Sequence, residues 1–231
     1  MQPPSPFALL FAPDRAMQRQ ALVGRTLPIL LFTWACALLL AAALAIRVDA
    51  GDSALSKLET SGELKNMSDR QVADETRKAE RIFQVVTIAK AAVRPLLELG
   101  LNCLALLGLC WFLRGRVKKR AIAPVAAAAL LPGGIANLLD AASAFQHSAV
   151  PPDGVPLVPR TLSAVLQLIG HPLAEPWVKL GNVLDFFSFW GMVLMAYGVA
   201  AAGQLPKKNA VIGTIVAWIC YRLLSEVAIG S

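Results

Sequence analysis

The chain has 231 residues, of which 56% are hydrophobic and 16% are charged. Soluble globular proteins are about 45–50% apolar and about 25% charged, so this composition is displaced toward that of membrane proteins. The mean hydropathy of +0.58 agrees. The same composition excludes intrinsic disorder, a collagen helix, a coiled coil and a disulfide-rich secreted scaffold.

The net charge of +7 comes from 22 Lys and Arg residues against 15 Asp and Glu residues. A nucleic-acid-binding protein would carry its basic residues on a soluble face, interleaved with aromatic residues. Here the densest basic run, residues 114–120, is squeezed between two apolar segments. That position is typical of a short cytoplasmic loop, so we expect no nucleic-acid partner.

Five apolar runs are long enough to cross a bilayer, whose core of about 30 Å needs about 20 residues of helix. A spanning backbone must satisfy its own hydrogen bonds, which excludes open sheet. The predicted fold class is therefore all-α, an integral membrane protein with five transmembrane helices. The predicted spans, which together form a membrane domain over residues 27–229, are about residues 27–46, 95–113, 121–145, 180–202 and 210–229.

The first apolar run has features of a secretory signal, because residues 43–45 (ALA) have the form of a cleavage box. However, the run is longer than the apolar core of a signal peptide, which has about 7–15 residues. We interpret it as an uncleaved span that follows a cytoplasmic N-terminal segment, residues 1–26. Within that segment, Pro6–Phe11 followed by Pro13 predicts a short interfacial element with Phe and Leu as anchors.

Basic residues concentrate in the cytoplasmic loops of membrane proteins. The N-terminal segment, residues 114–120 and residues 204–209 carry ten Lys and Arg residues, with Asp14 as the only acid. Residues 47–94 instead carry nine basic and eight acidic residues. This asymmetry predicts a multi-pass protein of the inner membrane with a cytoplasmic N-terminus, an extracytoplasmic C-terminus, and external loops at about residues 47–94 and 146–179.

The first external segment is expected to begin as a loop, because residues 48–67 mix Gly, Ser and charged residues. Ser68 and Gln71 then have the spacing of a capping box. Apolar residues follow at three- and four-residue steps, namely Val72, Ala79, Ile82, Phe83, Val86, Ala89 and Val93. The pattern predicts an extracytoplasmic amphipathic helix that continues through Pro95 into the second span. Its apolar stripe must rest on the membrane surface, on the bundle or on a partner.

The second external segment contains six prolines and both histidines of the chain. Residues 162–169 within it are apolar but few, which predicts an interfacial helix rather than a span. His147 and His171 are 24 residues apart in proline-rich sequence, so we expect no metal site from them.

The chain contains no catalytic or cofactor motif: there is no phosphate loop, no dinucleotide fingerprint, no HExxH and no GxSxG. The cysteines lie inside apolar runs without CxxC spacing, and they are Cys36, Cys103, Cys110 and Cys220. We interpret them as small packing residues, although Cys103 and Cys110 share a helix face. The sequence therefore predicts a protein that is not an enzyme and that has no metal or cofactor.

One group of polar residues lies near the outer ends of the predicted spans, where ionisable side chains suggest a functional site. The group consists of Glu98, Asn102, Asn137, Asp140, Asn182, Asp185 and Glu226. Hard cations prefer such carboxylate and amide oxygens, so a small transporter or channel is one hypothesis. The alternative is that these groups cap helices, join helices by hydrogen bonds, or pair with a neighbour such as Arg222.

Several short motifs, taken in order, resemble the Yip domain family, whose members are named for interacting with Ypt/Rab GTPases. The motifs are residues 10–16 (LFAPDRA), 68–83, 130–132 (LLP), 184–190 (LDFFSFW), 191–198 (GMVLMAYG), 207–210 (KKNA) and Trp218. The resemblance covers about residues 7–228 and implies an integral five-span protein without catalytic residues. The alanine-rich spans and the short N-terminal segment point to the bacterial branch. That segment is too short for the GTPase-binding role of the eukaryotic relatives, so a small GTPase is not an expected partner.

The sequence thus favours a non-enzymatic inner-membrane protein that organises the membrane or partner proteins. Its expected partners are the lipid bilayer and a protein or second copy of the chain that docks on helix faces. Small residues let helices approach closely, and those considered for this role are Gly100, Gly108, Gly191 and Gly198.

Overall fold

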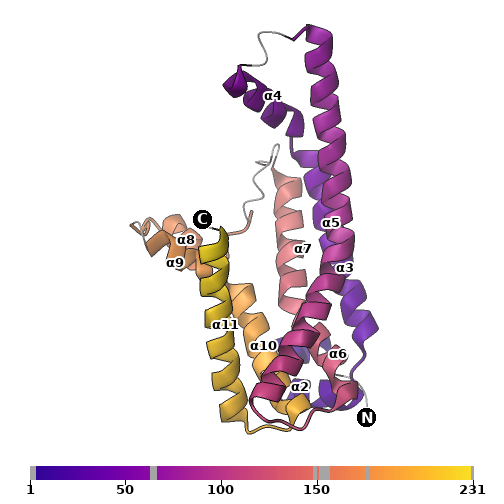
Figure 1. Cartoon of the computed structure of the whole chain (residues 1–231), viewed down its shortest axis with the longest axis vertical. Helices are drawn as coiled ribbons and strands as arrows, with labels where there is room; N and C mark the ends of the chain where they lie inside the picture. Colours follow the sequence, from indigo (N-terminus) through magenta and orange to yellow (C-terminus); the bar gives the residue numbers. More distant parts are fainter. Residues whose placement is uncertain (1–3, 63–66, 148–149, 151–156, 175–176, 230–231) are drawn as a thin grey trace. The chain divides into compact units, whose positions relative to one another are not determined.

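The structure is a computed structural model that describes residues 4–62, 67–147, 150, 157–174 and 177–229. The side chains of residues 222–229 are among those left undescribed. The described chain is all-α, as predicted (Figure 1). Its helices are α1 (Pro6–Phe11), α2 (Pro13–Val23), α3 (Thr26–Arg47), α4 (Ala50–Ser61), α5 (Asp69–Phe112), α6 (Lys119–Ala128), α7 (Leu131–Gln146), α8 (Leu162–Leu168), α9 (Trp177–Val183), α10 (Phe186–Gly203) and α11 (Lys207–Ile229).

Four helical segments are long and apolar enough to cross a membrane, which is consistent with a membrane-embedded protein. They are Thr26–Arg47, Asp69–Phe112, Lys119–Gln146 and Phe186–Gly203. The fifth predicted span corresponds to α11, which has 23 residues. Because the described side chains stop at Tyr221, the fifth span stays a prediction.

The chain divides into two compact units that share α3, α5 and α7. The first unit comprises Met1–Thr33, Pro95–Ala136 and Pro159–Ser231, and the second comprises Trp34–Arg94 and Asn137–Val158. The first unit holds the larger apolar core, in which Met17, Leu106 and Val125 are fully buried.

In the first unit, the amphipathic helix α2 packs against α6 and α10, while α10 and α11 lie side by side (Figure 1). Met17 and Gln20 lie on the buried side of α2. The carboxamide nitrogen of Gln20 donates to the carbonyl oxygen of Pro124 at 3.1 Å, so this buried polar group is satisfied. The N-terminal segment is therefore a packed part of the helical core of this unit.

Two of the predicted small residues allow close helix packing in the first unit. A Cβ atom added at Gly198 would lie 2.3 Å from Cγ1 of Val125, and one at Gly191 would lie 3.2 Å from the carbonyl oxygen of Ala129. At Gly100 and Gly108, a Cβ atom would have no described neighbour within 4 Å. The close approach thus occurs on α10 and not on α5.

The third predicted span, residues 121–145, is not one helix but two. Helix α6 ends at Ala128 and α7 begins at Leu131. Pro132 has no amide hydrogen to donate to the carbonyl of Ala128, so one regular helical hydrogen bond is missing at the break. A tighter bond from the amide of Leu130 to the carbonyl of Ala127, at 3.0 Å, closes α6 instead.

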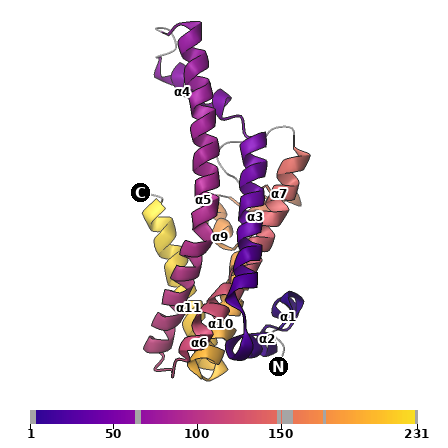
Figure 2. The same ribbon diagram turned by 90° about the vertical axis from the view of Figure 1, so that its right-hand side faces the viewer.

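In the second unit, α5 runs antiparallel to α3 (Figure 2). The Trp34 indole N–H donates to the Ala92 carbonyl oxygen at 2.8 Å, and the Gln84 carboxamide donates to the Ala45 carbonyl oxygen at 3.4 Å. Small residues fill the space between these helices, namely Ala37, Ala41 and Ala91. Residues 84–92 of α5 therefore lie alongside residues 34–45 of α3.

Helix α7 contributes the other apolar contact of the second unit. Ala141 and Ala144 pack against Ala43, with Phe83 at the edge of the cluster. The Arg47 guanidinium donates to the Phe145 carbonyl oxygen at 3.2 Å, which ties the ends of α3 and α7 together.

The prediction of a loop over residues 48–67 is wrong for residues 50–61, which form α4. The side chain of Asp49 accepts a hydrogen bond from the amide of Asp52 at 3.0 Å and so caps the helix. Gly62 ends it in the left-handed conformation, with φ of 75°. Both signals are local, and the mixed composition of the segment concealed them.

The predicted capping box is confirmed at the start of α5. The amide of Ser68 donates to Oε1 of Gln71 at 2.8 Å, and the amide of Gln71 donates to Oγ of Ser68 at 3.5 Å. The helix also continues through Pro95, as expected.

The predicted apolar stripe of α5 is largely uncovered in the described chain. Phe83 packs against the Ala43 cluster, but Ile82, Val86 and Val93 are 53%, 41% and 51% exposed. No described helix of the second unit covers these three residues, and the surface on which the stripe would rest stays a prediction.

Candidate functional site

Six of the seven predicted site residues have described side chains, and they fall into three local pairs. The pairs are Glu98 with Asn102 on α5, Asn137 with Asp140 on α7, and Asn182 with Asp185 at the junction of α9 and α10. The side chain of the seventh residue, Glu226, and that of its proposed partner Arg222 lie outside the described part of the chain.

Asp185 is the N-cap residue of α10 and not part of a span. One carboxylate oxygen accepts from the amide of Ser188 at 2.7 Å, and the other lies 3.0 Å from Nε of Arg160. This corrects the prediction of a continuous helix over residues 180–202. An Asp side chain that accepts from a backbone amide three residues ahead favours a helix start at that point.

Arg160 is held beside Asp185 by a short backbone bridge. The amide of Leu162 donates to the carbonyl of Leu184 at 3.0 Å, and the amide of Phe186 donates to the carbonyl of Arg160 at 3.0 Å. The start of α8 is thereby tied to the start of α10, and the ion pair forms across this junction.

Asn182 belongs to the same junction. Its carboxamide oxygen accepts from the hydroxyl of Ser163 and, at 3.5 Å, from that of Thr161. Thr161 also caps α8 by accepting from the amide of Ala164 at 3.3 Å. The sequence patterns do not single out Arg160, Thr161 and Ser163 as members of the site. The available signal was that Arg160 is one of two basic residues in the segment 146–179.

The other two pairs also bond to the backbone. Asp140 is 5% exposed, and its carboxylate accepts from the amide of Val158 at 3.1 Å. In the first unit, the carboxamide of Asn102 donates to the carbonyl of Ala126 at 3.4 Å. Glu98 and Asn137 are half-buried.

These contacts define what the predicted site does. Each side chain of the predicted site that has a described hydrogen bond does one of three things: it caps a helix, it joins two helices, or it holds a loop against a helix. Within the described residues, no group of three His, Cys, Asp and Glu residues has the geometry of a metal site. A ring nitrogen of His147, Nδ1, lies 2.8 Å from the carbonyl oxygen of Ser143, and the four cysteines are free thiols.

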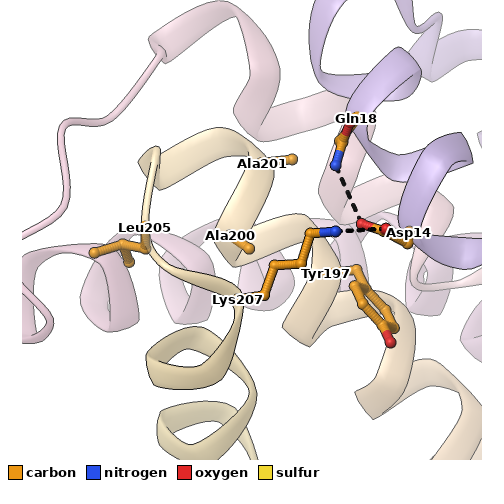
Figure 3. A pocket seen from close by; sticks show the side chains of 7 residues that line it. All are labelled: Asp14, Gln18, Tyr197, Ala200, Ala201, Leu205 and Lys207. Carbon is orange, nitrogen blue, oxygen red and sulfur yellow. Dashed lines mark hydrogen bonds and ion pairs between the residues drawn. The ribbon is translucent and has the colours of Figure 1, made fainter.

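A hollow of about 220 Å³ opens where α2 meets the turn between α10 and α11 (Figure 3). Its lining residues are Asp14, Gln18, Tyr197, Ala200, Ala201, Leu205 and Lys207. The ammonium of Lys207 donates to Asp14 at 2.6 Å, and the carboxamide of Gln18 donates to the other oxygen of Asp14 at 3.1 Å. The sequence showed Asp14 only as the single acid among basic residues.

The basic loop between α5 and α6 lies against the end of α10. The amides of Arg116 and Lys118 donate to the carbonyls of Gly203 and Ala202 at 2.8 and 2.9 Å. These bonds supply donors to carbonyl groups that have no hydrogen-bond partner within the helix, because the last carbonyls of a helix lack one. The loop needs glycine at position 115, because a Cβ atom there would lie 2.8 Å from the carbonyl oxygen of Gly203.

Comparisons of the chain with protein-family models, with curated proteins and with solved structures find no match. The resemblance to the Yip domain family accordingly rests on the motifs in the sequence.

Proposed function

We propose that this protein is a non-enzymatic, multi-pass protein of the bacterial inner membrane, of the Yip type, that organises the membrane or partner proteins. In this proposal the chain has five spans, a cytoplasmic N-terminus and an extracytoplasmic C-terminus. Four apolar helical segments of membrane-spanning length support the membrane location, and the asymmetry of basic residues supports the orientation.

The observation that carries the proposal is that Asp140 and Asp185 of the predicted site serve as structural groups. Asp185 caps α10 and pairs with Arg160, while Asp140 accepts from the amide of Val158. Carboxylates whose oxygens are taken up by capping and pairing serve the packing of the chain. This arrangement favours a structural protein over one that conducts or transforms a substrate.

The Yip-like motifs agree with a structural role in this fold. Residues 184–190 contain the Asp185 cap, Gly198 lies close to Val125 of α6, and Gly191 lies close to Ala129 directly after α6. The motif thus coincides with residues that hold helices together.

A thermal melt of the detergent-purified protein against a panel of cations and pH values tests the proposal. We expect a response that is flat across the cations. The double variant Asp140→Asn/Asp185→Asn should melt at a lower temperature with every cation alike, because it removes the charge that pairs with Arg160, while each Asn keeps an oxygen that can accept the amide bonds. A matched control is Asp74→Asn/Asp69→Asn, which removes the same charge from the exposed start of α5.

A small transporter or channel is the second candidate, and one observation favours it. Discontinuous helices often mark the binding sites of transporters, and the predicted third span is interrupted between α6 and α7. This candidate expects one cation to raise the melting temperature by mass action. It also expects the effect to vanish in Asp140→Asn/Asp185→Asn while persisting in the control, which would overturn the structural proposal.

A further inference from the structure

The first unit gathers ten exposed basic side chains at one end. They are Arg15, Arg19, Arg25, Arg114, Arg116, Lys118, Lys119, Arg120, Lys207 and Lys208, here called the basic end. Asp14 is the only acid in these three segments of chain, and its carboxylate is already paired with Lys207. The basic end therefore carries a strong excess of positive charge.

Tertiary contacts hold the three segments of the basic end together. The Asp14–Lys207 ion pair joins α2 to the start of α11. The amides of Arg116 and Lys118 bond to the last carbonyls of α10, and Gln20 bonds to Pro124 in α6. Figures 1 and 2 both show α2, the start of α6 and the turn between α10 and α11 at the same end of the unit.

The placement of several of these cations has an electrostatic cost within the chain. Lys118 is the N-cap residue of α6, and Lys207 and Lys208 begin α11. The helix dipole disfavours positive charge at a helix N-terminus, and neither helix has an acidic residue in its first turn. An external anion would relieve both the dipole and the mutual repulsion of the basic side chains.

Large apolar side chains next to the basic end are exposed. Phe11 and Trp111 are each 82% exposed, Phe112 is 76% exposed and Leu22 is 61% exposed. Aromatic residues are enriched where a protein meets the polar boundary of the bilayer. Apolar anchors beside a dense set of cations match a surface of acyl chains beneath anionic headgroups, and not a free anion in water.

We propose that the basic end binds the headgroups of anionic phospholipids in the cytoplasmic leaflet. The phosphates lie against the loop between α5 and α6 and against the starts of α6 and α11, while Phe11, Trp111 and Phe112 enter the acyl boundary. This inference rests on the membrane orientation in the proposed function, and not on the organising role.

The test titrates the detergent-purified full chain with short-chain phosphatidylglycerol, and separately with phosphatidylcholine of the same chain length. Each basic residue near an anionic surface contributes about a fivefold gain in affinity. We expect phosphatidylglycerol to bind at least about tenfold more tightly than phosphatidylcholine. Equal binding of the two lipids overturns the proposal, as does inorganic phosphate that binds as tightly as phosphatidylglycerol.

Two variants that each lose four positive charges test whether the lipid preference depends on the loop between α5 and α6. The loop variant replaces Arg116, Lys118, Lys119 and Arg120 by Gln, which leaves the backbone bonds of the loop in place. The matched control replaces Arg70, Arg77, Lys78 and Arg81 on α5 by Gln. We expect the loop variant to lose most of the preference and the control to keep it, and equal losses in both variants would refute the location.

A titration of the unaltered protein with salt tests the proposal even if the loop variant does not fold. About 0.5 M NaCl should abolish the lipid preference of the unaltered protein, because salt screens exposed charges. A preference that withstands salt contradicts a headgroup site made of exposed cations. The absence of a lipid preference would not change the expected thermal melts with the panel of cations. The lipid inference and the proposed function can therefore fail separately.

Discussion

The indole of Trp34, in the first half of α3, donates to the carbonyl oxygen of Ala92 on α5 at 2.8 Å. With the bond from Gln84 to Ala45, this contact sets the register of the two helices. If α3 crosses the bilayer over residues 27–46, then residues 84–92 of α5 share its depth. The hydropathy of the sequence instead predicts that α5 enters the bilayer at about residue 95.

A cysteine at position 89 distinguishes these two registers. Ala89 is exposed on the surface of the chain, so a thiol there is shielded only when lipid covers it. In a cysteine-free background, we expect Ala89→Cys to resist a membrane-impermeant thiol reagent in intact vesicles, while Asp74→Cys reacts from the outside. Rapid labelling of Ala89→Cys would place residue 89 in water and favour a span that begins at residue 95.

Gly198→Leu should destabilise the first unit. Its Cβ atom alone would lie 2.3 Å from Cγ1 of Val125 and 3.0 Å from Cε of Met17, both of which are fully buried. Overpacking of a core costs about 1–3 kcal/mol or more in the free energy of unfolding. The melting temperature of the purified protein measures this loss.

Gly108→Leu serves as the matched control for that substitution, because a Cβ atom at Gly108 has no described neighbour within 4 Å. We expect its melting temperature to stay close to that of the unaltered protein. A large loss in Gly108→Leu, with none in Gly198→Leu, would contradict the packing of α10 on α6.

Substitutions at Asp185 separate its two contacts. Asn still caps a helix, so Asp185→Asn removes only the ion pair with Arg160, whereas Asp185→Ala removes the ion pair and the bond from Ser188. Loss of an N-cap costs about 0.5–2 kcal/mol. We therefore expect Asp185→Ala to lower the free energy of unfolding by about 1 kcal/mol more than Asp185→Asn does. Equal losses in a denaturation series would show that the cap contributes nothing.

Asp140 should hold the segment around Val158 in place. In Asp140→Ala the partly buried amide of Val158 loses its acceptor, and leaving such a group unsatisfied costs up to about 1–3 kcal/mol. Asp140→Asn retains a carbonyl oxygen that can accept the same bond. We expect faster hydrogen exchange at the amide of Val158 in the Ala variant, and nearly unchanged exchange in the Asn variant.

Exchange that is equally slow in both Asp140 variants would indicate that the carboxylate does not protect this amide. The amide of Ser188, which bonds to Asp185 instead, provides an internal reference in each variant.

Local signals in the sequence predicted some helix starts well and others poorly. The capping box of Ser68 and Gln71 depends on two residues three apart, and it is confirmed. The same kind of information was present for α4, in Asp49 and Gly62, but the mixed composition of residues 48–67 suggested a loop. Composition averages over a segment, whereas a cap depends on single residues.

The all-α class, the apolar segments of membrane-spanning length and the uneven distribution of basic residues could be predicted from the amino-acid order, because each depends only on which residue types follow one another along the chain. Which polar groups contact one another depends instead on how the helices pack in three dimensions. Arg160 reaches Asp185 across 25 residues of sequence, and Trp34 reaches Ala92 across 58. Hydropathy carries no information about such pairs, because the free energy of a hydrogen bond or an ion pair depends on the distance between two atoms and not on the composition of the segments that carry them.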